Sequence, residues 1–68
     1  MRVYYDKETD SVYIKLSDKK PTGVVEVSEL INVDTTEKDE IVGIEILRAS
    51  QKIPLNSVTK LDYVSKTA

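Results

Sequence analysis

Two alternating runs of apolar and polar residues stand in RVYYDKETDSVYIKL, residues 2–16. Val3 and Tyr5 alternate with polar neighbours in the first run, and apolar residues occupy positions 12, 14 and 16 in the second. A period of two is typical of a half-buried β-strand. The polar residues 7–10 between the runs favour a turn. The stretch therefore predicts a β-hairpin, and with it a β-rich fold.

The alternation also specifies how the two strands of this hairpin pair. Folding about residues 8 and 9 sets apolar residues opposite one another on one face. A slip of one residue would set apolar side chains against polar ones on both faces. The predicted pairs are Tyr5 with Val12, Val3 with Ile14, Met1 with Leu16, Tyr4 with Tyr13, and Arg2 with Lys15.

Three further strands are expected after a loop at residues 18–23, which is rich in charge and contains Pro21 and Gly23. Residues 41–47 form the longest β-branched run, and their low polarity favours a central strand. The fold class expected is mainly β (β-rich α+β), with an antiparallel sheet of about five strands. Their expected ranges are 2–6, 11–17, 24–28, 30–34 and 41–47.

The second hairpin, formed by residues 30–34 and 41–47, is specified less well. Two registers that differ by two residues keep Ile31 and Val33 beside Val42, Ile44 and Ile46, and the sequence does not choose between them. Gly43 within a strand indicates a bulge or a close approach by other backbone. Apolar residues at 30, 41 and 47 fall on the other face, so the sheet is expected to be covered on both sides, by the C-terminal segment or by a second subunit.

The C-terminal segment allows two interpretations. Pro54 suits the first turn of a helix, and apolar residues recur every three positions from 55 to 61, which favours a short helix near 54–61. Residues 59, 61 and 63 also alternate as in a strand, and this alternative stays open. Residues 65–68 are expected to be frayed.

Length and residue usage limit what the chain can be. Its 68 residues predict one small domain, 1–68, whose core gives little net stability. The absence of cysteine and histidine excludes disulfides, thiolate zinc sites and the commonest metal ligand and general base. Self-association is the remaining source of stability, so a homodimer is expected.

The charge balance indicates the class of partner. Ten basic and twelve acidic residues give a net charge of −2, and Lys19 and Lys20 are the only adjacent basic pair. Binding to a phosphate backbone requires clustered positive charge, so nucleic acid is not the expected partner and a small basic protein suits the chain better. No apolar run approaches the length of a membrane span, and no signal region is evident, so a cytoplasmic location is expected.

No constellation of residues predicts catalysis, and we expect a non-enzymatic protein without cofactor or metal. No histidine can activate a serine. Asp6, Glu8 and Asp10 alternate as in a calcium loop, but that template requires glycine and glutamate where Ser11 and Ser17 stand. A second acidic group allows a weak Mg²⁺ or Ca²⁺ site, but turn chemistry explains the same residues. Its members are Asp34, Glu37, Asp39 and Glu40.

The candidate interaction face consists of Tyr4, Tyr13, Arg2 and Lys15. Tyrosine is enriched at interfaces because it combines apolar area with a polar tip. Two tyrosines side by side can instead simply stabilise the sheet. A third alternative is stacking with the bases of a single-stranded nucleic acid or with a small ligand.

Two blocks, residues 5–16 and 41–50, resemble a small prokaryotic domain-of-unknown-function family, numbered 2283. The resemblance covers about residues 1–50 and implies a compact β-sheet protein. Members often have glycine in the turn where this chain has Asp39, a residue type that tolerates positive φ. The family brings no catalytic residues, and some members resemble predicted antitoxins. The resulting hypotheses are an antitoxin-like interaction module acting as a homodimer, a nucleic-acid or ligand binder, and a purely structural homodimer.

Overall fold

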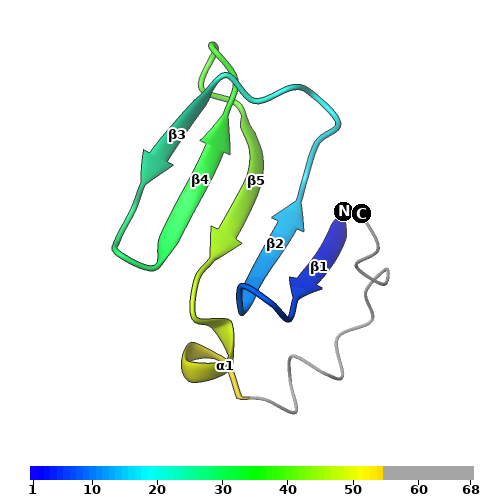
Figure 1. Ribbon diagram of the computed structural model, residues 1–68. Helices are drawn as coiled ribbons and strands as arrows, with labels where there is room; N and C mark the ends of the chain where they lie inside the picture. Colours follow the sequence, from blue (N-terminus) through cyan, green and yellow to red (C-terminus); the bar gives the residue numbers. More distant parts are fainter. Residues whose placement is uncertain (55–68) are drawn as a thin grey trace.

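The computed structural model describes residues 1–54 and shows one five-stranded antiparallel sheet with a short helix at its end (Figure 1). The strand order is β1-β2-β5-β4-β3, which places β5 in the centre as its composition predicts. The mainly β fold is therefore confirmed. The elements are β1 (Arg2–Asp6), β2 (Ser11–Lys15), β3 (Gly23–Glu26), β4 (Ile31–Thr35), β5 (Ile41–Ile46) and α1 (Ala49–Lys52).

The first hairpin has the register that the alternation predicts. β1 and β2 pair with Val3 opposite Ile14, Tyr4 opposite Tyr13 and Arg2 opposite Lys15. The Asp6 carboxylate accepts a hydrogen bond of 3.0 Å from the backbone N–H of Glu8 and so fixes the start of the turn. Asp10 closes the turn with a φ of 54°.

β4 and β5 adopt one of the two registers that the sequence allows. Val33 lies opposite Ile44 and Ile31 opposite Ile46. The ladder then shifts, because Asp34 pairs with Gly43 but Thr35 pairs with Ile41. Val42 is therefore the extra residue of a β-bulge, a device that redirects a side chain.

Two apolar rows cross the sheet on one face, which we call the apolar face. Strand pairing aligns their members from neighbour to neighbour, so that side chains of one row share a face. The first row crosses all five strands and the second crosses four. The rows are Val3, Ile14, Ile44, Val33 and Val25, and Tyr5, Val12, Ile46 and Ile31.

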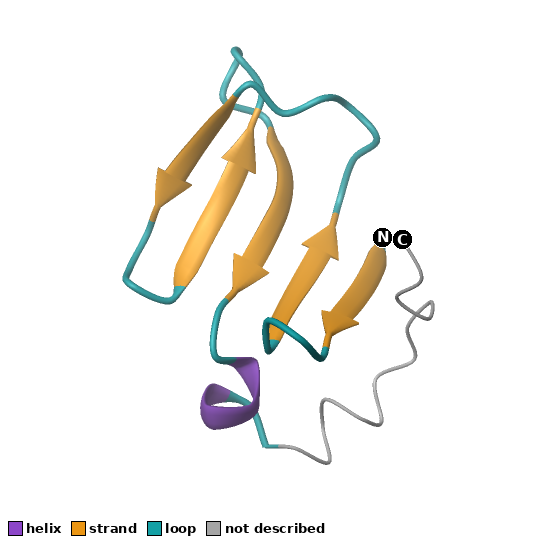
Figure 2. Ribbon diagram, viewed as in Figure 1, coloured by secondary structure: helices purple, strands orange, loops and turns teal. Residues whose placement is uncertain are grey.

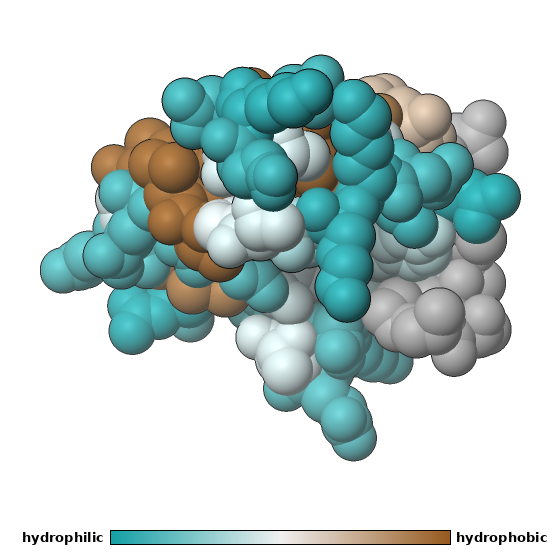
Figure 3. Space-filling model, turned by 90° about the horizontal axis from the view of Figure 1, so that it is seen from above, coloured by the Kyte–Doolittle hydropathy of each residue, from teal (hydrophilic) through white to brown (hydrophobic). Residues whose placement is uncertain are grey.

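No described element forms a second layer over this face. The sheet is a single layer, and α1 lies at its end beside the β1–β2 turn (Figure 2). Within residues 1–54 the fully buried apolar residues are Val12, Val42 and Ala49 alone. Val25 is 52 % exposed, and apolar side chains gather on the side where β3 lies (Figure 3). The described part of the chain thus has a sheet but almost no enclosed core.

The short helix of the structure lies before the stretch for which the sequence predicts one. α1 covers residues 49–52 and follows Arg48, whose φ is 51°. A contact distant in sequence fixes it, since the backbone N–H of Ala49 donates a 2.8 Å hydrogen bond to the carbonyl of Asp10. The periodicity of the sequence cannot predict a contact between residues so far apart in the chain. Of the predicted helix near 54–61, Pro54 is not helical, and the remainder lies outside the described residues, as does the alternative strand.

Candidate functional site

The face opposite the apolar rows is predominantly polar, and we call it the tyrosine face. Strand pairing aligns two rows of residues across it. These rows are Tyr4, Tyr13, Glu45, Asn32 and Glu26, and Arg2, Lys15, Gly43, Asp34 and Val24. The candidate interaction residues of the first hairpin therefore share a face, as their spacing predicts.

Tyr13 reaches from β2 across β5 to β4. Its hydroxyl donates a 2.9 Å hydrogen bond to the Asp34 carboxylate. Burial, together with this hydrogen bond, raises the pKa of Tyr13 to about 12. The hydroxyl therefore keeps its proton, and with it the hydrogen bond to Asp34, well into the alkaline range.

Gly43 provides the space through which Tyr13 passes. A Cβ atom at this position would collide with the hydroxyl oxygen and the Cζ atom of Tyr13. The close approach expected at this glycine is therefore confirmed: the Tyr13 side chain comes nearest, and the backbone carbonyl oxygen of Ile14 would lie 3.0 Å from the added Cβ atom. The bulge that the sequence offered as the alternative also occurs, one residue earlier, at Val42.

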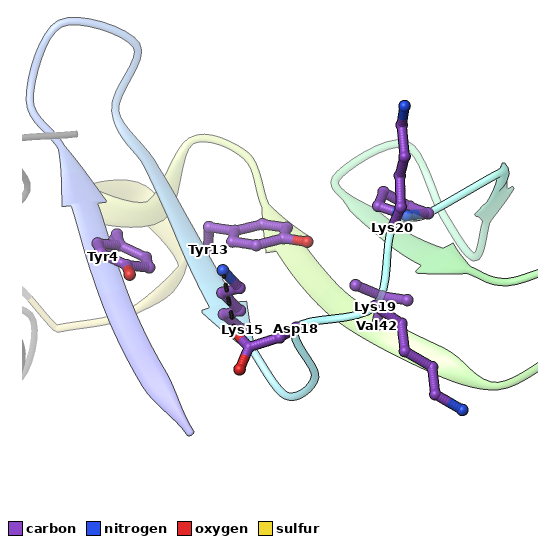
Figure 4. A pocket seen from close by; sticks show the side chains of 8 residues that line it. Tyr4, Tyr13, Lys15, Asp18, Lys19, Lys20 and Val42 are labelled. Atoms are coloured by element: carbon purple, nitrogen blue, oxygen red, sulfur yellow. Dashed lines mark ion pairs between the residues drawn. The ribbon is translucent and has the colours of Figure 1, made fainter.

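A groove of about 590 Å³ lies on the tyrosine face, within the range typical of small-molecule sites. Tyr4 and Tyr13 lie beside each other on one side of it, and the 18–21 segment runs along the other (Figure 4). The bulge redirects Val42, which the sequence had grouped with Ile44 and Ile46, into this groove. The lining residues are Tyr4, Tyr13, Lys15, Asp18, Lys19, Lys20, Pro21 and Val42.

The charges around the groove are predominantly positive. Its lining contains three lysines and one acid, whereas the whole chain has ten basic and twelve acidic residues. Lys15 forms an exposed ion pair with Asp18 at 3.4 Å, and Lys19 forms one with Glu40 at 2.8 Å. Within residues 1–54, Lys20 has no ion-pair partner.

Arg2 lies outside this groove. It lines a second, smaller hollow, which Lys15 shares. The Tyr4 hydroxyl beside it raises the pKa of the Arg2 guanidinium. The structure thus brings three of the four candidate residues, Tyr4, Tyr13 and Lys15, to one groove and places the fourth at its neighbour.

The acidic residues singled out in the sequence make local structural contacts. The Asp10 carboxylate accepts hydrogen bonds from the Tyr5 hydroxyl at 2.8 Å, the Ser50 hydroxyl at 2.7 Å and the Ser50 backbone at 3.1 Å. Those bonds, Ser50 foremost, hold the pKa of Asp10 below its ordinary value. In the described range, no group of three or more acidic side chains could hold a metal ion.

Sequence reasoning missed six residues of this site. Four of them come from the β2–β3 connection, whose path over the sheet no periodicity reveals: Asp18, Lys19, Lys20 and Pro21. The bulge directs Val42 into the groove. Asp34 can bind the Tyr13 hydroxyl only because the β5 residue that lies between them is glycine. The one available signal was Gly43 itself.

Comparison with known proteins places the chain in a family. Residues 2–50 match the family described as "Protein of unknown function (DUF2283)", so the chain belongs to it. Neither the curated proteins nor the solved structures contain a match to the chain. Among the residues described, no helix is both long and apolar enough to span a membrane.

Proposed function

We propose that this DUF2283 member is a non-enzymatic interaction module that acts as a homodimer, in which a second copy covers the apolar face. The observation that carries the proposal is the pair of apolar rows over which no described element packs. Val25 is 52 % exposed and most other members of the rows are only half-buried, and apolar surface left open in this way marks an interaction site.

The dimensions of the apolar face suit a second sheet of the same size. Five strands spaced about 4.8 Å apart, each about 17 Å long, give a flat footprint of about 400 Å² per copy. Side chains project from the sheet, so the accessible area exceeds this flat footprint. Two copies together therefore reach the roughly 1,000 Å² of buried surface that a specific interface needs. Sheets of similar twist pack face to face about 10 Å apart.

Energetics favour such a pairing. Burying apolar surface contributes roughly 25 cal/mol per Å². Association costs an estimated 4–15 kcal/mol in lost translational and rotational freedom. The pairing therefore requires several hundred Å² of apolar surface between the two copies.

Val24 and Val25 give a matched pair of variants to test this proposal. Both lie on the edge strand β3, and they are 65 % and 52 % exposed, but only Val25 belongs to an apolar row. Val25→Lys should weaken the dimer at least tenfold, because it sets an ammonium group in the interface. Val24→Lys adds the same charge on the tyrosine face and should leave the dimer unchanged.

Sedimentation equilibrium of the full chain measures both effects. A wild-type protein that stays monomeric at 100 µM, or two variants that weaken association equally, would contradict the proposal. The same variants also test the antitoxin-like role. A purified small basic protein that displaces the second copy, and that Val25→Lys fails to bind, would identify the apolar face as an inhibitory surface.

A further inference from the structure

We propose that the groove on the tyrosine face binds a nucleotide unit, meaning a planar base attached to a phosphate. This inference concerns the face opposite the proposed dimer interface and does not depend on it. The groove combines an aromatic wall with a rim of lysines, and each part recognises one half of such a ligand.

The aromatic wall is rigid. Tyr13 lies across Gly43 and is anchored through its hydroxyl to Asp34, so one side of the ring is turned to the sheet. The ring lines the groove and is only half-buried, which leaves surface on which a base can stack. The phenol is uncharged at neutral pH, as tyrosine ordinarily is, so it does not repel an anion.

The opposite rim supplies positive charge. Lys19 and Lys20 stand on the segment that faces the tyrosines, with their side chains pointing in opposite directions, and Lys15 lies on β2 beside Tyr13 (Figure 4). Lys20 is exposed and lacks an ion-pair partner within residues 1–54, so a phosphate can engage it without breaking an existing contact. Asp18 is the one lining acid, and it holds Lys15 at 3.4 Å.

Asp18 allows a test in which one substitution should strengthen binding and another should weaken it. Its carboxylate opposes an incoming phosphate and competes for Lys15, so Asp18→Asn should strengthen binding several-fold. Lys20→Gln should weaken binding and lower the salt slope of log K by about 0.7, the value for one phosphate contact on a single strand. Lys7→Gln removes the same charge from the exposed β1–β2 turn and serves as the matched control.

The test follows ¹H–¹⁵N NMR shifts of the full chain at about 20 mM salt, with thymidine 5′-monophosphate in one arm and an eight-thymidine single strand in the other. The proposal expects shifts at Tyr13, Lys20 and Val42. Equal affinity per nucleotide in both arms would identify a free nucleotide as the ligand, and binding of the oligomer alone would identify a single strand. Absence of groove shifts in both arms, or equal weakening by Lys7→Gln and Lys20→Gln, would overturn it.

Discussion

The ring of Tyr13 occupies the space that a side chain at position 43 would fill, so Gly43 and Tyr13 form one packing unit across two strands. Glycine is ordinarily unfavourable inside a strand, because it loses more backbone freedom on folding than other residues do. At this position it is required, since it lets Tyr13 reach Asp34 two strands away.

A double-mutant cycle tests this unit. Gly43→Ala should lower the free energy of unfolding by about 1–3 kcal/mol, because the new methyl group collides with the tyrosine. In a Tyr13→Val background the same substitution should cost much less, because only the Ile14 carbonyl oxygen, 3.0 Å from the new Cβ atom, remains close. Urea unfolding of the four proteins measures the coupling. Gly43→Ala with the same effect in both backgrounds would show that the two residues are independent.

Tyr13 should also make stability depend on alkaline pH. Its pKa in the folded chain, about 12, lies above the unfolded value near 10, so the contribution of the neutral hydroxyl is complete below pH 10. That contribution is lost as the pH rises from about 10 to 12. The stability advantage of wild type over Tyr13→Phe should therefore shrink across this window in urea titrations. A constant difference would mean that burial and the Asp34 hydrogen bond do not raise the pKa of Tyr13 in the folded chain.

Asp10 should make stability depend on acidic pH, with stability lost as the pH falls. Hydrogen bonds from Ser50 and Tyr5 lower the pKa of Asp10 in the folded chain, so its contribution is complete above the unfolded pKa and falls away as the pH drops through the folded one. Wild type should exceed Asp10→Asn in stability at pH 6, and the difference should narrow below about pH 4. Asp6→Asn, which alters a neighbouring turn acid, is the control.

The turn between β4 and β5 contains a residue in an unfavourable backbone conformation. Asp39 has a φ of 64°, in the left-handed region that glycine adopts without steric cost. Asp39→Gly should raise the free energy of unfolding by up to about 1 kcal/mol. Lys38→Gly, one residue earlier and outside that region, should lower it by about 0.5–1 kcal/mol. Thermal denaturation distinguishes the two, and a loss of stability in both would contradict the prediction.

The fold was predictable wherever period-two patterning acts on neighbouring strands. The β1–β2 register follows from Val3, Tyr5 and their partners, because a slip of one residue would turn the apolar side chains of one strand to the opposite face. The β4–β5 register did not follow, since a shift of two residues leaves both faces unchanged. The turn decides it, through Asp39 in its left-handed conformation and the 2.9 Å bond from the Thr36 N–H to the Glu40 carbonyl.

The candidate site was predictable in part for the same reason. Tyr4 and Tyr13 lie opposite each other through the first hairpin alone. The contact of Tyr13 with Asp34 depends on β2 lying beside β5, and the lysine rim depends on the path of a loop. Neither is a property of local sequence.

The strand order also bears on the speed of folding. β1–β2 and β3–β4–β5 are each built from local turns, whereas only the β2–β5 ladder joins them, through pairs such as Ile14 with Ile44. Hairpins form in about 1–10 µs. Joining the two units closes a long stretch of chain, and the entropic cost of that closure arises before the contacts between the units form. Docking of the two units should therefore limit the rate. The contacts of Val3 form within the first hairpin and those of Ile44 form no later than docking, so conservative truncation of either residue should mainly slow folding, which stopped-flow chevron plots would measure.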